Sequence, residues 1–234
     1  MTTSFNKEKH EYLIDGKRAT GVTTIIGVLA KPALIGWAAK CAIEFVQTAI
    51  ASGLELTPEL LNDAKNAHTK RKEAAGTHGT DAHASVEEWI NLCLKSDGKP
   101  NFAMPHTTDI KKFVDWAVAN VDHFIFSERQ MFNKDLFIAG TADFAYVGKD
   151  GKKYMADFKT SSGIYGIDYW LQCAAYRMLA EAEGDTPYDG CTVVRLGKDG
   201  AFEVQQRFDY DTDKEAFLCC LKLYRAQATY IKPK

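Results

Sequence analysis

The sequence lacks several features that would assign a protein class at once. Its six cysteines show no CxxC spacing, which argues against a zinc or iron–sulfur site and is typical of reduced thiols. Residues 1–7 contain no apolar targeting segment, and no stretch reaches the roughly 18 apolar residues that a membrane helix requires. We therefore expect a cytoplasmic protein without an iron–sulfur cluster and without a membrane anchor.

The sequence also lacks an excess of positive charge. Its 29 Lys and Arg residues stand against 31 Asp and Glu residues, a formal net charge of −2. This balance excludes a protein that coats nucleic acid through bulk positive charge. It does not exclude a local nucleic-acid site, because a carboxylate cluster lowers the net charge while the divalent cations it binds supply positive charge to a polyanionic substrate.

No linker rich in Pro, Gly or Ser divides the 234 residues, so we expect one domain. The hydrophobic pattern is mostly helical in the first half of the chain and rich in strands after Phe124. The first half contains a hairpin within residues 10–30 and helices over 32–52, 58–94 (interrupted near Gly76 and Gly79) and 107–121. The second half contains strands 124–132, 137–147 and 153–158, a helix over 164–183, strands 191–196 and 201–208, and a last helix to about 230.

These elements predict an α/β fold with a mixed central sheet that contains an antiparallel meander and is flanked by helices. Within a single domain over 1–234, residues 1–75 would form an N-terminal hairpin and helices. Residues 76–185 would form the core, and residues 186–234 a C-terminal hairpin and helix.

The predicted meander brings acidic side chains together. A hairpin at the turn 148–151 places Asp143 opposite Asp157, where the Cβ atoms of paired residues lie about 5 Å apart. Two like charges at that distance are unfavourable unless a divalent cation lies between them. The preceding turn predicts that Glu128 lies across from Thr141 and beside Asp143.

Asp157 and Lys159 project to one face of their strand, because side chains alternate along a strand. With Glu128 and Asp143 they would form a patch of three acids and one ammonium. The alternative is a solvated sheet face with a surface ion pair, and a register slip of one residue would scatter the patch.

At these residues the sequence resembles the PD-(D/E)XK nuclease superfamily, in particular its RecB-like and phage-type exonucleases. The resemblance covers roughly residues 75–180, and Asp157 stands where Glu is more usual. The matching segments are Gly79-Thr80-Asp81-Ala82-His83, Gly140-Thr141-Ala142-Asp143, Asp157-Phe158-Lys159-Thr160, and the pair Gln172 and Tyr176.

The resemblance implies a restriction-endonuclease-like core that binds Mg²⁺ or Mn²⁺. The implied metal ligands are His83, Asp143, Asp157 and the backbone carbonyl of Phe158, with Glu128 completing the site or holding a second ion. Lys159 would orient or deprotonate the attacking water and stabilise the charge that develops on the phosphate. Gln172 and Tyr176 would position their helix and the nucleic-acid strand.

Some of these residues have simpler interpretations. His83 and Glu87 are one helical turn apart and could form only a hydrogen-bonded pair at a helix packing surface. Lys70, Arg71 and Lys72 could be a solvated helix face or could follow the phosphates of bound DNA.

The sequence thus predicts a divalent-metal-dependent DNA exonuclease of recombination, replication or repair, in the cytoplasm of a bacterium or a phage-infected host. No module for reading base sequence is visible, which favours action at ends or structures. The alternatives are a structure-selective or RNA-directed endonuclease of the same superfamily, and a catalytically silent nucleic-acid-binding protein. DNA is the expected partner, a recombination or single-strand-binding protein is a further possible one, and an oligomer is possible.

Overall fold

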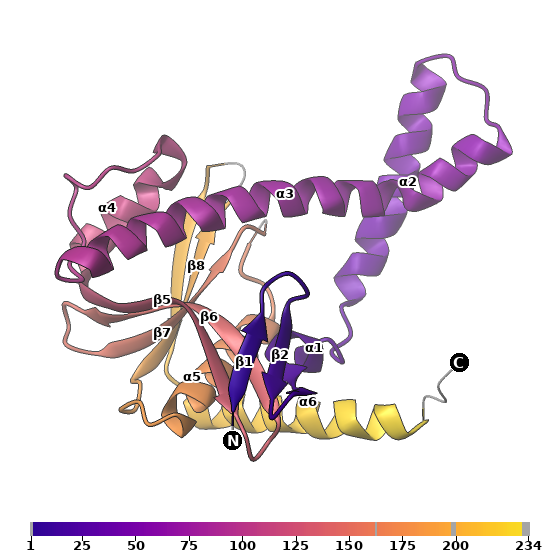
Figure 1. The fold of residues 1–234 in the computed structure, drawn as a ribbon. Coiled ribbons are helices and arrows are strands. Elements are labelled where there is room, and N and C mark those ends of the chain that lie inside the picture. Colours follow the sequence, from indigo (N-terminus) through magenta and orange to yellow (C-terminus); the bar gives the residue numbers. More distant parts are fainter. Residues whose placement is uncertain (1, 162, 198–199, 231–234) are drawn as a thin grey trace. The chain divides into compact units, whose positions relative to one another are not determined.

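The computed structural model describes residues 2–161, 163–197 and 200–230, with the side chains of residues 74–81 outside this description (Figure 1). Contacts divide the chain into two compact units. The larger comprises Met1–Leu29 and Ala82–Lys234, and the smaller comprises Ala30–Asp81. Because two such units can belong to one domain, the single-domain organisation stays a prediction.

The larger unit is built on a six-stranded mixed sheet with the strand order β4-β6-β7-β8-β9, and β5 pairs with the free side of β6. The β5/β6, β6/β7 and β8/β9 pairs are antiparallel, whereas β4/β6 and β7/β8 are parallel. The α/β fold with a mixed central sheet and an antiparallel meander is therefore confirmed. The strands are β4 (Thr20–Gly21), β5 (Val121–Asn133), β6 (Ile138–Gly148), β7 (Lys153–Lys159), β8 (Gly190–Leu196) and β9 (Phe202–Arg207).

Helices cover both faces of this sheet, because its strands carry apolar side chains on both faces (Figure 1). On one face Phe144 and Phe158 pack with Trp89 of α3 and Phe113 of α4. On the other face the core includes Met155, residues of α5 such as Leu171, and residues of α6 and α1. The helices are α1 (Val22–Ile26), α3 (Pro58–Ser96), α4 (Lys111–Asn120, preceded by a short 3₁₀ helix, Thr108–Ile110), α5 (Ile167–Ala182) and α6 (Tyr210–Tyr230).

A small three-stranded sheet precedes the large one and contains the predicted hairpin. It consists of β1 (Thr3–Asn6), β2 (Glu11–Ile14) and β3 (Lys17–Arg18). The turn at Asp15 and Gly16 has φ angles of 49° and 74°, a left-handed pair that Asp-Gly readily adopts in a two-residue hairpin.

The smaller unit contains α2 (Pro32–Ala51) and the first part of α3. Within it the Arg71 guanidinium lies 2.6 Å from the Glu44 carboxylate, and Lys70 lies 3.1 Å from Asp63. Among the described residues α2 is the one helix that is long and apolar enough to cross a membrane, by length and composition only. The interruption predicted near Gly76 and Gly79 is wrong, because the backbone forms one helix from Pro58 to Ser96.

Candidate metal and catalytic site

The acids lie where β6 and β7 separate. Residues 144–147 of β6 pair with β7, residues 138–139 pair with β4 on the same side, and the positions between them have no strand partner there in the described chain. The register predicted from the turn 148–151 is confirmed, but the ladder ends at Phe144 and Ala156, one pair before Asp143 and Asp157. Beyond the last backbone pair, the Asp143 side chain connects the two strands. The Phe158 N–H donates a hydrogen bond of 2.6 Å to Asp143 Oδ2.

Glu128 reaches the same place from β5. Its neighbours Ser127 and Arg129 pair with Phe144 and Ala142, so Glu128 is level with Asp143 and not with Thr141 as predicted. The prediction was wrong because the turn lies one residue later than expected, with Asn133 paired to Ile138. Glu128 also has a left-handed backbone, with φ at 49°. Such a conformation costs a non-glycine residue about 1 kcal/mol or more and is concentrated at functional sites.

Three potential metal ligands converge at this point. One ligand atom each of His83, Glu128 and Asp143 lies within 4.8 Å of the other two. The three residues come from α3, β5 and β6, and all are half-buried. The His83 ring stands edge-on to the Phe158 ring, with centroids 5.7 Å apart, and hydrogen-bonds to the Phe158 backbone. An imidazole with two carboxylates is a ligand set that can hold a divalent cation.

Asp157 lies beside this trio but is engaged differently. Its side chain is 1% exposed, and its Oδ2 forms an ion pair with the Lys159 ammonium. Its Oδ1 has no hydrogen-bond partner among the described residues. A buried carboxylate oxygen without a partner is costly, so this atom is a second indication that the site is built to receive a cation or a polar ligand.

Lys159 is held by residues of α5. Its Nζ donates to Gln172 Oε1 at 3.2 Å, and Gln172 Nε2 donates to the Tyr176 hydroxyl at 2.9 Å. Tyr176 is buried and packs on Gly140, where an added Cβ would lie 2.6 Å from Tyr176 Cε1. Gln172 and Tyr176 therefore hold the Lys159 side chain in place through this chain of hydrogen bonds. Their contact with DNA stays a prediction.

Burial and mutual repulsion shift the pKa values of the acids. Burial, with the Asp143 charge, raises the pKa of Glu128 to about 8. Burial likewise raises the pKa of Asp143, and it raises that of Asp157 to about 6 against the opposing effect of the Lys159 ammonium. Without a cation Glu128 therefore keeps a proton at neutral pH, and a bound cation would displace it.

The two basic groups respond in opposite directions. Burial lowers the pKa of His83, which keeps the imidazole neutral and able to bind a metal. Burial also disfavours the Lys159 ammonium, but the Asp157 and Asp143 carboxylates outweigh it and raise the Lys159 pKa. Lys159 is therefore a permanent positive charge next to the ligand trio.

Sequence reasoning missed one contact at the site. The Tyr12 hydroxyl of β2 lies 2.9 Å from Thr141 Oγ1. A side chain of the small sheet therefore reaches the part of β6 where β6 and β7 separate. No local pattern could have found this contact, because the two residues are 129 positions apart. The predicted DNA-binding residues Lys70, Arg71 and Lys72 belong to the other unit. The side chain of Thr80, in the predicted motif over residues 79–83, lies outside the described residues.

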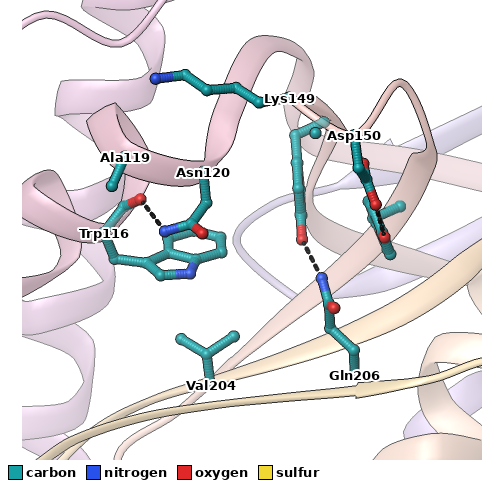
Figure 2. Close-up of a pocket in the computed structure, with 10 residues that line it drawn as sticks. Trp116, Ala119, Asn120, Lys149, Asp150, Val204 and Gln206 are labelled. Carbon is teal, nitrogen blue, oxygen red and sulfur yellow. Dashed lines mark hydrogen bonds between the residues drawn. The ribbon is translucent and has the colours of Figure 1, made fainter.

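A cavity of about 370 Å³ opens near the other end of β6, beside the turn to β7 (Figure 2). The Gln206 amide donates to the Tyr146 hydroxyl at its floor over 3.1 Å, and the Asn120 amide donates to the Trp116 carbonyl over 2.8 Å. None of the residues of the acid site lines this cavity. The residues around it are Trp116, Ala119, Asn120, Tyr146, Gly148, Lys149, Asp150, Tyr154, Val204 and Gln206.

Comparisons with known proteins find only distant likenesses to solved structures. No protein-family model and no curated protein matches this chain. One solved structure similar to it, the crystal structure of SSO0001, is 15% identical with a TM-score of 0.34, and the match covers 87% of this chain and 75% of that one. Another, LHK-Exo in complex with dAMP, is 11% identical with a TM-score of 0.36, and the match covers 91% and 95% of the two chains. Likenesses this low carry no argument about fold or activity, so the functional case rests on the site itself.

Proposed function

We propose that this chain is a divalent-metal-dependent nuclease that hydrolyses phosphodiester bonds where β6 and β7 separate. One observation carries the proposal: His83, Glu128 and Asp143 converge within 4.8 Å beside the buried Asp157–Lys159 ion pair. Acids in a merely solvated sheet face would not be buried together, and they would not hold raised pKa values around an oxygen without a partner.

The residues present fit a Mg²⁺ or Mn²⁺ ion. His83, Glu128 and Asp143 would hold it, with the Phe158 carbonyl and Asp157 Oδ1 as further oxygen donors nearby. Such an ion activates a water molecule and neutralises the phosphate oxygens during hydrolysis. It would also offset the repulsion among the carboxylates, which accounts for their proximity.

The chain's own residues supply the rest of the chemistry. The Lys159 ammonium, held by Asp157 and Gln172, is oriented to donate to an oxygen of the phosphate as its negative charge increases. A charge fixed in advance in a buried site needs little reorganisation during the reaction. Because Lys159 stays protonated, this electrostatic role suits it better than that of a general base.

We further propose that the substrate is DNA and that the enzyme acts as an exonuclease in recombination, replication or repair. The absence of a base-reading module in the sequence supports action at DNA ends. The net charge of −2 supports binding that depends on the cation, since bulk charge gives no attraction to a polyanion. DNA remains the proposed partner, and a recombination or single-strand-binding protein and an oligomer remain secondary proposals.

The test is degradation of linear DNA, covalently closed circular DNA and RNA in Mg²⁺ or Mn²⁺. We expect wild-type protein to degrade linear DNA, and Asp143→Asn and Lys159→Met to lose about 100-fold or more of the rate. The matched control is Asp135→Asn, an exposed acid in the turn between β5 and β6, which should keep the wild-type rate. Equal rates in all variants would refute the site. Equal cleavage of closed circles, or cleavage of RNA alone, would replace the exonuclease by one of the alternative endonucleases.

A further inference from the structure

An exposed tyrosine follows the proposed catalytic lysine. Tyr165 lies in the segment between β7 and α5, six residues after Lys159, and its side chain is 78% exposed. Aromatic side chains of this size normally bury most of their surface. Tyr165 therefore presents an apolar ring to solvent within a few residues of the proposed site.

The tip of this ring lies close to the backbone of Gly163. A Cβ atom added at Gly163 would overlap the Tyr165 ring at Cζ, Cε1 and the hydroxyl, so the ring lies directly on Gly163. Most of the ring is exposed to solvent, and its contact with Gly163 is at its hydroxyl end. An exposed aromatic face of this kind is available to a stacking partner.

The segment that carries the ring is tied to the site. The Arg195 guanidinium donates to the Ser161 carbonyl at 2.6 Å, and the Ser161 hydroxyl donates to the Gly163 carbonyl at 2.8 Å. The Tyr169 hydroxyl donates to Ser161 Oγ at 3.3 Å, while the Tyr169 ring lies 5.2 Å from Lys159 Nζ. Ser161 thus connects the position of Gly163 to that of Lys159.

We propose that Tyr165, supported by Gly163, is a stacking platform for a nucleobase of the strand whose phosphate lies at Lys159. This inference rests on the proposed nuclease function. Nucleobases fit the surface because each has a flat π-face, and stacking of this kind is independent of base identity. The platform would hold one nucleotide of the substrate while Lys159 engages its phosphate.

The test compares the KM and kcat of DNA degradation in five variants. Tyr165→Ala should raise KM on the order of tenfold with kcat nearly unchanged, whereas Tyr165→Phe should match wild type because it keeps the ring. Gly163→Ala should raise KM as Tyr165→Ala does, since the new methyl displaces the ring. The double variant should show no further loss. Phe102→Ala removes another exposed aromatic side chain, 57% exposed, and should change nothing.

Direct stacking has its own readout. An oligonucleotide containing 2-aminopurine, bound in Ca²⁺ so that cleavage does not interfere, should lose fluorescence on wild-type protein and on Tyr165→Phe but not on Tyr165→Ala. Equal quenching by Tyr165→Ala, or an unchanged KM, overturns the platform. If wild-type protein degrades no nucleic acid, the nuclease proposal fails, and quenching that depends on Tyr165 would still support the stacking site.

Discussion

The raised pKa of Glu128 predicts how the stability of the protein depends on pH when no divalent cation is bound. The ordinary pKa is 4.5, and in the folded chain it is about 8 because of burial and the Asp143 charge. Between these values the folded protein keeps a proton that the unfolded chain loses. The stability that this proton contributes is fully present below pH 4.5, falls as the pH rises, and is lost above about 8.

The magnitude follows from the two pKa values. Each tenfold difference in proton affinity corresponds to about 1.4 kcal/mol, so a pKa that moves from 4.5 to about 8 corresponds to ~5 kcal/mol at most. Glu128 is only half-buried, and solvent screening reduces this figure to ~2 kcal/mol. Glu128→Gln keeps the shape of the side chain and the left-handed backbone but carries no charge at any pH. We expect the variant to be ~2 kcal/mol more stable than wild type at pH 8, with the difference vanishing near pH 4.

The assay is urea unfolding in EDTA across this pH range, followed by circular dichroism. Asp135→Asn is the matched control, because it removes an exposed acid and should keep the wild-type pH profile. Mn²⁺ at pH 8 should stabilise wild type and so reduce or reverse the difference. Parallel profiles of wild type and Glu128→Gln in EDTA would show that Glu128 is not strained by its neighbours, and the electrostatic argument for the site would fail.

Three further predictions follow from the contacts of the site. Lys159→Met should lower stability at pH 8 by about 3–5 kcal/mol in urea unfolding, because Asp157 then becomes a buried charge without a counterion, and adding Asp157→Asn should recover most of the loss. If the double variant is as unstable as Lys159→Met, the ion pair is not the cause. Gly140→Ala should cost about 1–3 kcal/mol through overlap with Tyr176, and a wild-type Tm would show that α5 can move away from β6. Mn²⁺ at about 100 times its Kd should stabilise wild type by about 2.7 kcal/mol, and Asp143→Asn should show no such shift in thermal unfolding.

Local chemistry accounts for the part of the structure that the sequence predicted well. Aromatic and β-branched runs around the turns 133–135 and 148–151 are sufficient to predict the strands of the meander. The ends of most elements fall within a few residues of the prediction. The period of two along a strand is equally local. It placed Asp157 and Lys159 on one face, and the two residues form an ion pair in the structure.

Register was predictable only where the turn fixed it. The tight turn 148–151 gave the correct pairing of β6 and β7, whereas the turn before β6 was placed one residue early, which displaced Glu128 by two positions. The true turn depends on the Asn133 side chain, which accepts a hydrogen bond of 2.8 Å from the Leu136 N–H, and on a left-handed Phe137. Neither feature is apparent from residue type alone.

The sequence by itself determined which residue types are present and which face of each strand they occupy, because alternation and turn chemistry act over a few residues. Only the tertiary structure decided that β6 and β7 separate at Asp143. On that side of β6 the residues 144–147 pair with β7, whereas residues 138–139 pair with β4. The tertiary structure also decided that His83 and Glu128 arrive there from other elements, that Asp157 is buried with one oxygen unpartnered, and that the Tyr165 ring lies on Gly163. Burial and long-range contact set these features, because the energy of bringing charges together depends on what surrounds them in space and not on their spacing along the chain.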